Sequence, residues 1–331
     1  GHTGMAPCAC TGGPVSTSSN DERQMLRDTV RSLVTKRADS AAVRKAMESE
    51  RGYDENLWTV LCEQVGAAAL LVPEELGGAG GELADAAVVV EELGRGLVPS
   101  PLMGTLWAEL ALLEAGYQGE LLESLAAGES IGAVAFDPGY VVNGAIADVV
   151  LTLDGDEVHR AENVTATALS TMDPARRLAA VVVSGNEPIG TAPGLIDKAG
   201  LLLAAEQVGA AARALELTVE YTKTRVQFGR TIGSFQALKH RMADLYVLVE
   251  SARAIVYQSI QDLTAEAATV ARIKASEALS AVAADSIQLH GGIAITWEHD
   301  AHLYFKRAHG SALLLGTPRQ LLPSLESAAG L

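Results

Sequence analysis

The chain has 331 residues, enough to bury a sizeable core and to form two or three domains. Apolar residues make up 48% of the chain and aromatic residues only 4%, which favours close-packed helices with cores of alanine, leucine and valine. The formal net charge of −16 argues against a nucleic-acid-binding surface, because such a surface needs a basic face. A phosphorylated ligand stays possible, since backbone N–H groups and a few arginines can hold one locally.

The cysteines and the hydropathy pattern indicate a reducing, non-membrane environment. Cys8, Cys10 and Cys62 are too few and too poorly placed for a disulfide framework or a four-ligand zinc site. No run approaches the ~18 apolar residues of a membrane span, and no signal peptide is evident. Residues 1–20, rich in glycine, serine and threonine, read as a disordered or non-native lead-in. We therefore expect a cytoplasmic protein that binds neither nucleic acid nor a membrane.

Residues 21–128 have a helical pattern. Apolar residues from Met25 to Val34 recur at three- and four-residue steps, and Leu57–Ala69 and Leu83–Leu93 give further amphipathic helices. Proline and clustered glycine in Leu71–Gly81 interrupt the pattern, because neither continues a helix. The segment predicts a small N-terminal helical domain.

A different pattern covers residues 129–194. Ile131–Phe136, Ala147–Leu153 and Leu178–Val183 are short apolar runs, partly β-branched, separated by proline, glycine, aspartate and asparagine. They predict a reduced middle β domain, with room for only a few strands.

The strongest periodicity lies in residues 195–331. One set of apolar residues, called the seam here, recurs at alternating steps of three and four residues. This spacing is typical of a helix packed against near-antiparallel neighbours. Another long helix is expected at Ala265–Leu289, and a fourth near Asp300. The predicted fold is mostly α with a small β domain, in the order α–β–α, ending in a four-helix bundle. The seam residues are Phe235, Leu238, Met242, Leu245, Val249, Ala252 and Val256.

Two segments of this last region combine helix breaks with polar residues. Arg225–Arg230, followed by Ile232–Gln236, places a glycine and an aromatic residue at the break between two long helices. A tight turn there leaves Arg225 and a helix N-terminus free to meet an anion. Gln288–Ile293 contains a glycine pair that ends a helix, where backbone can approach a ligand without interference from a Cβ atom.

These segments, the seam helix and Gln288–Arg307 resemble the C-terminal domain of acyl-CoA dehydrogenases. The α–β–α order, the Leu71–Gly81 turn and the Met172–Arg176 stretch agree with this resemblance, which starts near Asp21 and is strongest after Leu195. In that family, the C-terminal domain of one subunit grips the pyrophosphate and adenosine half of an FAD whose ring lies in a neighbouring subunit.

The resemblance implies which residues of this chain contact FAD. Arg225 would pair with the pyrophosphate, whose geometry suits a guanidinium better than an ammonium. Ordinary core packing is the alternative reading for Phe228 and Phe235. The implied cofactor-binding residues are Arg225, Gln227, Phe228, Gly229, Gln236, Gln288, Leu289, Gly291 and Gly292.

The chain departs from the family where catalysis is concerned. Family members remove the α-proton of the thioester with a glutamate at one of two positions, and these fall on Ala199 and Leu315, neither of which accepts a proton. The arginine usual beside the first position falls on Gly200. Ala135–Asp148 corresponds to the family's flavin-binding stretch, but the strand whose hydroxyl residue cradles the flavin ring is deleted here. The catalytic base of this chain is therefore unknown.

Other titratable residues are weaker candidates. Glu206 lies one step from an apolar stripe, and Glu250 follows a seam residue, where a charge on an exposed helix face is commoner than a catalytic one; neither is expected to be the base. Four histidines near the C-terminus show no carboxylate partner geometry, and no metal site is expected. They are His290, His299, His302 and His309.

Three functional hypotheses follow. The leading one is a degenerate acyl-CoA dehydrogenase subunit in a hetero-oligomer, of α2β2 form, whose catalytic partner supplies the glutamate and the ring-binding β domain for an acyl-CoA substrate. Bulky acyl groups such as steroid side chains are only weakly implied. The second is an active homotetramer, in which the chain partners itself, with a relocated base. The third is a scaffold subunit without flavin.

Overall fold

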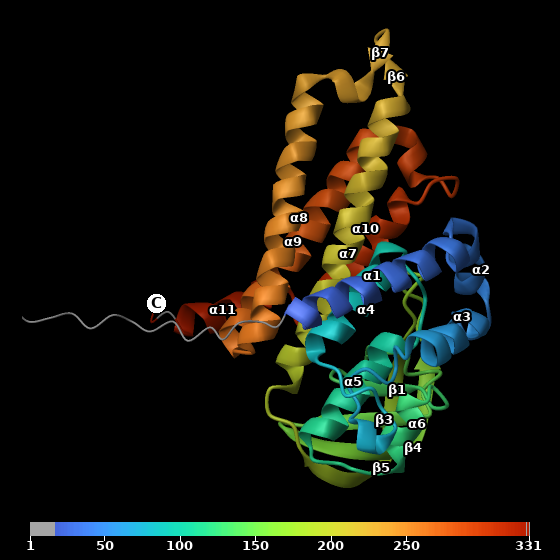
Figure 1. Ribbon diagram of the computed structural model, residues 1–331, viewed down its shortest axis with the longest axis vertical. Coiled ribbons are helices and arrows are strands. Elements are labelled where there is room, and N and C mark those ends of the chain that lie inside the picture. Colours follow the sequence, from blue (N-terminus) through green and yellow to red (C-terminus); the bar gives the residue numbers. More distant parts are fainter. Residues whose placement is uncertain (1–16, 329, 331) are drawn as a thin grey trace, which may run out of the picture.

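The computed structural model describes residues 17–328 and residue 330. A long helical bundle occupies one end of the molecule, and short helices with a β-sheet occupy the other end (Figure 1). Most of the predicted lead-in, residues 1–16, lies outside the described residues, and the first helix begins at Thr17, ahead of the predicted boundary. The predicted α–β–α order and mostly helical fold are confirmed.

Polar side chains fix the starts of some of the α-helices that build the N-terminal part. Asp39 accepts a hydrogen bond from the backbone N–H of Ala42 at 2.8 Å, and Asp54 caps the next helix in the same way. That helix is shorter than the sequence predicts, because a π-helical turn at Leu61–Val65 and the left-handed Gly66 follow it. The helices are α1 (Thr17–Arg37), α2 (Ser40–Glu48), α3 (Glu55–Val60), α4 (Leu83–Arg95), α5 (Leu102–Glu114) and α6 (Glu120–Ala126).

The sheet has five strands in the order β1-β3-β4-β5-β2. β1 and β3 are parallel and the other pairs are antiparallel. α5 packs against β1 and carries the sheet on the N-terminal helices. The strands are β1 (Gly132–Ala135), β2 (Val141–Val142), β3 (Val149–Asp154), β4 (Glu157–Ala168) and β5 (Leu178–Thr191).

The expectation of only a few strands is too low. β1, β3 and the first half of β5 coincide with the three predicted runs, but β4 was not anticipated. Most β4 side chains are exposed, so the strand lacks the alternation of apolar and polar residues that identifies a half-buried strand. Its pairing with β5 along almost its whole length holds it in place.

The C-terminal part is a bundle of long antiparallel helices, as predicted. The seam residues Met242, Leu245, Val249, Ala252 and Val256 are buried, while Phe235 and Leu238 at its start are partly exposed. The elements are α7 (Leu195–Thr224), the hairpin β6 (Val226–Gln227) and β7 (Arg230–Thr231), α8 (Gln236–Asp262), α9 (Ala265–His290), α10 (Ala301–Leu313) and α11 (Pro318–Ala328).

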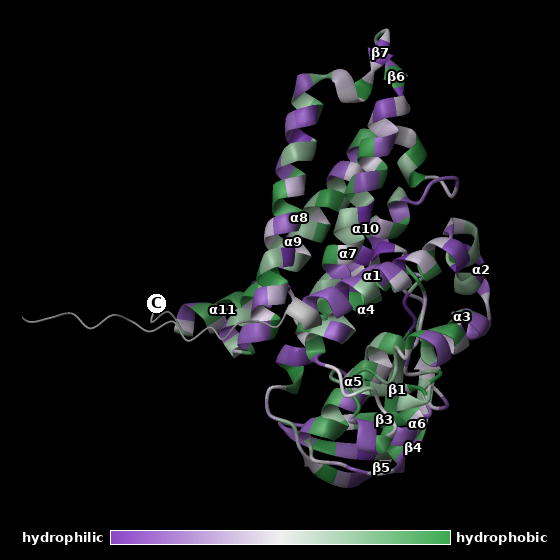
Figure 2. Ribbon diagram, in the orientation of Figure 1, coloured by the Kyte–Doolittle hydropathy of each residue, from purple (hydrophilic) through white to green (hydrophobic). Residues whose placement is uncertain are grey.

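α9 combines length and hydropathy that by themselves would suit a membrane helix. The segment Ala265–Ile295 meets that criterion, which core helices of water-soluble proteins also meet. α9 packs against α7, α8, α10 and α11, and the bundle helices carry hydrophilic as well as hydrophobic residues along their length (Figure 2). A place inside the bundle accounts for its apolar character.

Two glycines bring the N-terminal part against the bundle. A Cβ at Gly209 of α7 would lie 2.0 Å from the carbonyl oxygen of Glu91, and a Cβ at Gly94 of α4 would lie 2.3 Å from that of Glu206. Each helix therefore uses a glycine to let the backbone of the other approach closely. This crossing fixes the position of α7. That helix carries Ala199, one of the two positions at which the family resemblance implies a glutamate base.

Candidate functional site

The first predicted cofactor segment forms a projecting turn at the outer end of the bundle (Figure 1). Arg225 ends α7, and the β6–β7 hairpin turns at Phe228 and Gly229, whose φ angles are +54° and +77°. Phe228 is 91% exposed, which excludes the core-packing interpretation of this residue. Phe235 is partly buried, with the guanidinium of Arg230 3.8 Å from its ring centre.

The second segment lies at the same end of the bundle, where α9 stops. The ring of His290 stacks on Tyr221 of α7 with ring centres 4.4 Å apart, and the Tyr221 hydroxyl donates to the His290 carbonyl oxygen at 3.3 Å. Gly291 then turns the chain with φ +65°. The structure therefore brings together the two segments that the sequence singled out.

The predicted residues differ in what they present to solvent. Gln227, Gln236 and Gln288 are exposed, whereas the Leu289 side chain is only 8% exposed, so its backbone alone is available. Among the described residues, Arg225 forms no ion pair. Nothing lies within 4 Å of where a Cβ would stand at Gly229, Gly291 or Gly292.

This donor set fits the phosphate and adenosine half of a dinucleotide. An unpaired guanidinium suits a pyrophosphate, exposed amides suit a purine or ribose, and open glycines allow backbone to approach either. The His290 ring supports the turn, since its Nδ1–H donates to the Ser286 carbonyl oxygen at 2.7 Å. Its Nε2 is buried and has no hydrogen-bond partner in the described part of the chain.

The first vacated base position is closed off. Ala199 is fully buried, and its carbonyl oxygen accepts a hydrogen bond from the indole N–H of Trp107 at 3.1 Å. The neighbouring Gly200 lies under Arg272 of α9, because a Cβ there would stand 2.4 Å from the Arg272 Cδ. The space beside Gly200 is thus filled by an arginine side chain from another helix, which the spacing along α7 could not reveal.

The second vacated position faces a cavity. Leu315, with φ +57°, lies in the wall of a space of about 690 Å³ between α5, the sheet and α10. Asp137 and Asp173 are the carboxylates in this wall. Asp137 accepts a hydrogen bond from the Gly139 N–H, and Asp173 is held by Arg307 at 2.5 Å and by the Ala175 N–H at 3.0 Å.

Glu206 belongs to a buried charge cluster rather than to a reactive site. It accepts from Arg307 at 2.8 Å and pairs with Arg176, which also donates to Ser311. Asp173 completes the cluster through Arg307. Two carboxylates therefore face two guanidiniums, and burial lowers the pKa of Arg176. Glu250 pairs with Arg253 on the same helix, so neither glutamate is free to act as the relocated base.

The four histidines have aromatic neighbours. His290 and His299 lie 4.3 Å apart between ring centres, His302 meets Trp297 edge-on, and His309 packs on Phe305. Over residues 17–328, no group of three potential ligands gathers with metal-site geometry. Burial lowers the pKa of His290 and so favours the neutral ring.

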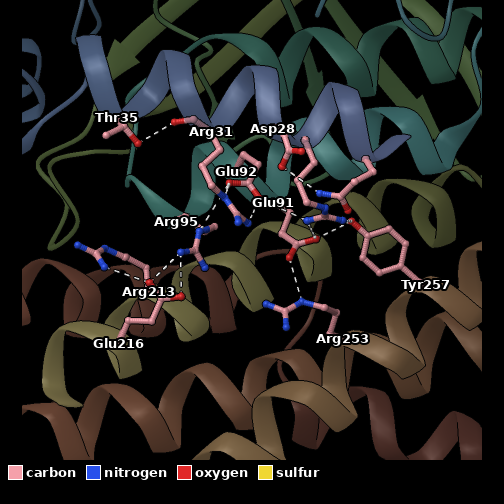
Figure 3. Close-up of polar contacts among 12 residues, drawn as sticks. Asp28, Arg31, Thr35, Glu91, Glu92, Arg95, Arg213, Glu216, Arg253 and Tyr257 are labelled. Carbon is pink, nitrogen blue, oxygen red and sulfur yellow. Dashed lines mark hydrogen bonds and ion pairs between the residues drawn. The ribbon is translucent and has the colours of Figure 1, made fainter. Parts of the chain in front are cut away.

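A second ionic network joins the two parts of the molecule (Figure 3). Glu91 and Glu92 of α4 are 1% exposed and meet arginines from α1, α4 and α8. Burial opposes ionisation of Glu91, but Arg27 and Arg253 outweigh it and hold the pKa of that carboxyl below its ordinary value. The network ties α7 and α8 of the bundle to α1 and α4.

Comparison with known proteins agrees with this geometry. The family model for "Acyl-CoA dehydrogenase, N-terminal domain" matches residues 20–136, and that for "Acyl-CoA dehydrogenase, C-terminal domain" matches residues 193–321. The chain therefore belongs to the acyl-CoA dehydrogenase family.

Individual relatives cover nearly the whole chain. Acyl-CoA dehydrogenase IpdE2 of Mycobacterium tuberculosis is 63% identical, covering 93% of this chain and 97% of its own length. The solved Tcur3481–Tcur3483 steroid ACAD has a TM-score of 0.84 and 28% identity, over 94% of this chain and 98% of that one. The ChsE4–ChsE5 complex from M. tuberculosis gives 0.83 and 26%, over 93% and 97%.

Proposed function

We propose that this chain is the non-catalytic subunit of a hetero-oligomeric acyl-CoA dehydrogenase. The observation that carries the proposal is that neither base position holds a carboxylate. Ala199 is fully buried, with its backbone carbonyl bonded to Trp107, and Leu315 offers only a hydrocarbon side chain. An α-proton of a thioester is removed only by a positioned, desolvated base. The partner subunit supplies that base and the pocket in which an acyl-CoA is dehydrogenated between its α and β carbons.

The chain's own contribution is half of the FAD site. Arg225, Gln236 and the Gly291–Gly292 turn face solvent at the end of the bundle that lies away from the chain's own sheet (Figure 1). From there they hold the pyrophosphate and adenosine of a flavin seated in the neighbouring subunit. Bound FAD supplies the acceptor for the hydride that leaves the β-carbon of the acyl group.

The assembly is proposed as an α2β2 heterotetramer. Two of the solved structures that this chain resembles are named as two-component assemblies, Tcur3481–Tcur3483 and ChsE4–ChsE5, and the first is named a steroid ACAD. These names support a two-component assembly and a bulky acyl group as the substrate class of the complex.

The homotetramer with a relocated base stays as the alternative. The carboxylates of the cavity wall are its candidates, and Asp137 is the more accessible of the two because Arg307 and Ala175 engage Asp173. This alternative predicts that the chain purified alone is yellow and reduces a dye with an acyl-CoA. The flavin-free scaffold predicts a colourless complex even after co-expression with the partner.

The experiment is Arg225→Ala in the co-expressed complex, measured as flavin per complex and as FAD affinity. A charge-assisted contact contributes roughly 1.5–3 kcal/mol, so the affinity should fall by about ten- to a hundredfold. Arg160→Ala, an exposed arginine on β4 at the other end of the molecule, is the matched control and should retain its flavin. Equal flavin retention in the two variants would contradict the proposal.

A further inference from the structure

A group of aromatic rings holds the end of α9 directly before the Gly291–Gly292 turn. The His290 ring is 4% exposed, stacks on Tyr221 of α7, and has its centre 4.3 Å from that of the His299 ring. Tyr221 also lies edge-on to His299, with ring centres 6.1 Å apart. Three rings from three separate segments therefore enclose the residue at which the turn begins.

The hydrogen bonds of the two imidazoles suit their neutral forms. His290 Nδ1 carries the proton, because it lies 2.7 Å from the Ser286 carbonyl oxygen, which can only accept. A proton added at the buried Nε2 would create a donor with no acceptor among the residues that the structure describes. His299 Nδ1 accepts the backbone N–H of Ala301 at 3.1 Å, so a proton added there would break this bond.

The charges around the rings do not compensate an imidazolium. Arg44 of α2 donates to the His299 carbonyl oxygen at 3.2 Å and engages the Asp300 carboxylate at 2.6 Å. Burial is the main cause that lowers the pKa of His290 and of His299. The other titratable or charged side chains of the surrounding segments are Tyr221, Glu298, His302 and Lys306.

We infer that His290 is a positioning residue for the flavin, and that it supports the Gly291–Gly292 turn only while its ring is neutral. The inference rests on the proposed function, in which this turn contacts the adenosine side of the partner's FAD. When His290 takes up a proton, its new N–H finds no acceptor in the stack, so the ring leaves Tyr221 and the turn loses its support. Acidification therefore releases flavin from the complex.

The direction of the pH dependence follows from the state of the ring in each form of the turn. In the closed turn the pKa of His290 is lowered, whereas in the opened turn it returns to the ordinary imidazole value of about 6.5. The FAD affinity should therefore be constant above this pH and fall below it. Since one proton is taken up, the fall should be about five- to tenfold between pH 7.5 and pH 5.5.

The test measures the FAD affinity of the co-expressed complex by flavin fluorescence at pH 7.5 and pH 5.5. His290→Phe keeps a ring on Tyr221, and His290→Asn keeps an N–H donor, but neither takes up a proton, so the affinity of each should change by less than about twofold. His159→Gln, on β4 at the other end of the molecule, is the matched control and should behave as the unmodified complex does. His240, 3.1 Å from the Gln236 amide nitrogen, is present in every complex, so its titration cancels.

Hydrogen–deuterium exchange of residues 286–296 supplies a readout that does not depend on flavin contact. After correction for the intrinsic pH dependence of amide exchange, this segment should exchange faster at pH 5.5 than at pH 7.5 in the unmodified complex, and equally at both in the His290→Phe complex. The inference is overturned if the segment exchanges alike in the two complexes, or if both lose FAD alike on acidification.

Failure of the proposed function gives a different result. A turn that opens in the unmodified complex alone, while FAD stays bound at both pH values, supports the role of His290 in the turn and contradicts the placement of the flavin beside it. Arg225→Ala at pH 7.5 tests that placement without acidification, so either proposal can fail without the other.

Discussion

The indole N–H of Trp107 donates a hydrogen bond to the backbone carbonyl of Ala199, 3.1 Å away. Both residues are almost completely buried. A large aromatic side chain from α5 therefore lies directly against the place on α7 where a family member can carry its glutamate. The loss of the base is accompanied by the filling of its surroundings, so one substitution at this position will not restore it.

A glutamate returned to either vacated position should behave differently. Ala199→Glu buries an unpaired carboxylate against Trp107 and should lower the free energy of unfolding by several kcal/mol. Leu315→Glu stands at a half-buried position in the cavity wall and should cost about 1–2 kcal/mol. Urea denaturation of the two variants measures the difference.

The Leu315→Glu variant also tests which subunit carries out the dehydrogenation. The Leu315→Glu chain, purified without its partner, should show no acyl-CoA-dependent dye reduction, because the flavin ring lies in the partner. Activity gained by this variant alone would instead support the homotetramer.

Glu109 of α5 should give stability a distinctive pH dependence. It is fully buried, neither of its carboxylate oxygens has a partner within the described residues, and burial raises its pKa well above the ordinary value. The folded state keeps the proton after the unfolded state has released it. Stability from this group is thus complete below the ordinary carboxyl pKa and is lost as the pH rises, by about 1.4 kcal/mol per pH unit, until the folded pKa is reached.

Urea denaturation at pH 5 and pH 8 checks this behaviour. Glu109→Gln should remove the decline in stability over that range, and Glu109→Met should raise stability at pH 8. Glu123→Gln, at an exposed position on α6, should keep the decline of the unmodified protein. An unchanged pH profile in Glu109→Gln would show that the carboxyl ionises in the folded protein.

Glu91 should act in the opposite direction. Its folded pKa is held below the ordinary value, so its contribution is present above the ordinary carboxyl pKa and is lost as the pH falls through the folded pKa. Glu91→Gln removes the buried carboxylate that Arg27 and Arg253 share, while Glu92 and Glu250 still pair with them, and should cost about 1.5–3 kcal/mol at neutral pH. Glu277→Gln removes an exposed pair with Lys274 and should cost less than about 1 kcal/mol. Thermal or urea unfolding of both variants compares them.

The α4–α7 crossing predicts a contrast between two helical glycines. Gly209→Ala places a methyl group 2.0 Å from the Glu91 carbonyl oxygen and should destabilise the protein by several kcal/mol as the helices separate. Gly310→Ala on α10 meets its nearest atom, the Asp173 Cβ, at 3.5 Å and should stabilise its helix by up to about 1 kcal/mol. Similar unfolding midpoints for the two variants would argue against a tight crossing.

Features that depend on local pattern could be predicted from the sequence. The seam from Met242 to Val256 is buried as its periodicity indicates, and Ala133, Val150 and Val181 lie in strands at predicted runs. Each of these signals is contained in one stretch of chain, where apolar residues repeat with the period of a helix or a strand.

Features that depend on distant contacts could not be predicted. Arg307 meets Asp173 across 134 residues, and Arg272 covers Gly200 from another helix, so neither role is visible in local spacing. Trp107 escaped notice for the same reason, because its partner Ala199 lies 92 residues along the chain. The Met172–Arg176 stretch is marked in the sequence only by its family resemblance, which does not reveal the partners of its aspartate and arginine.

The open turn at Gly291 and Gly292, with Arg225 beside it, has a consequence for handling the complex. If half of the flavin site is presented by one polypeptide and half by another, holding the cofactor is a bimolecular property. Dilution that separates the subunits should release flavin over the same protein concentrations, and added FAD should in turn draw the two chains together.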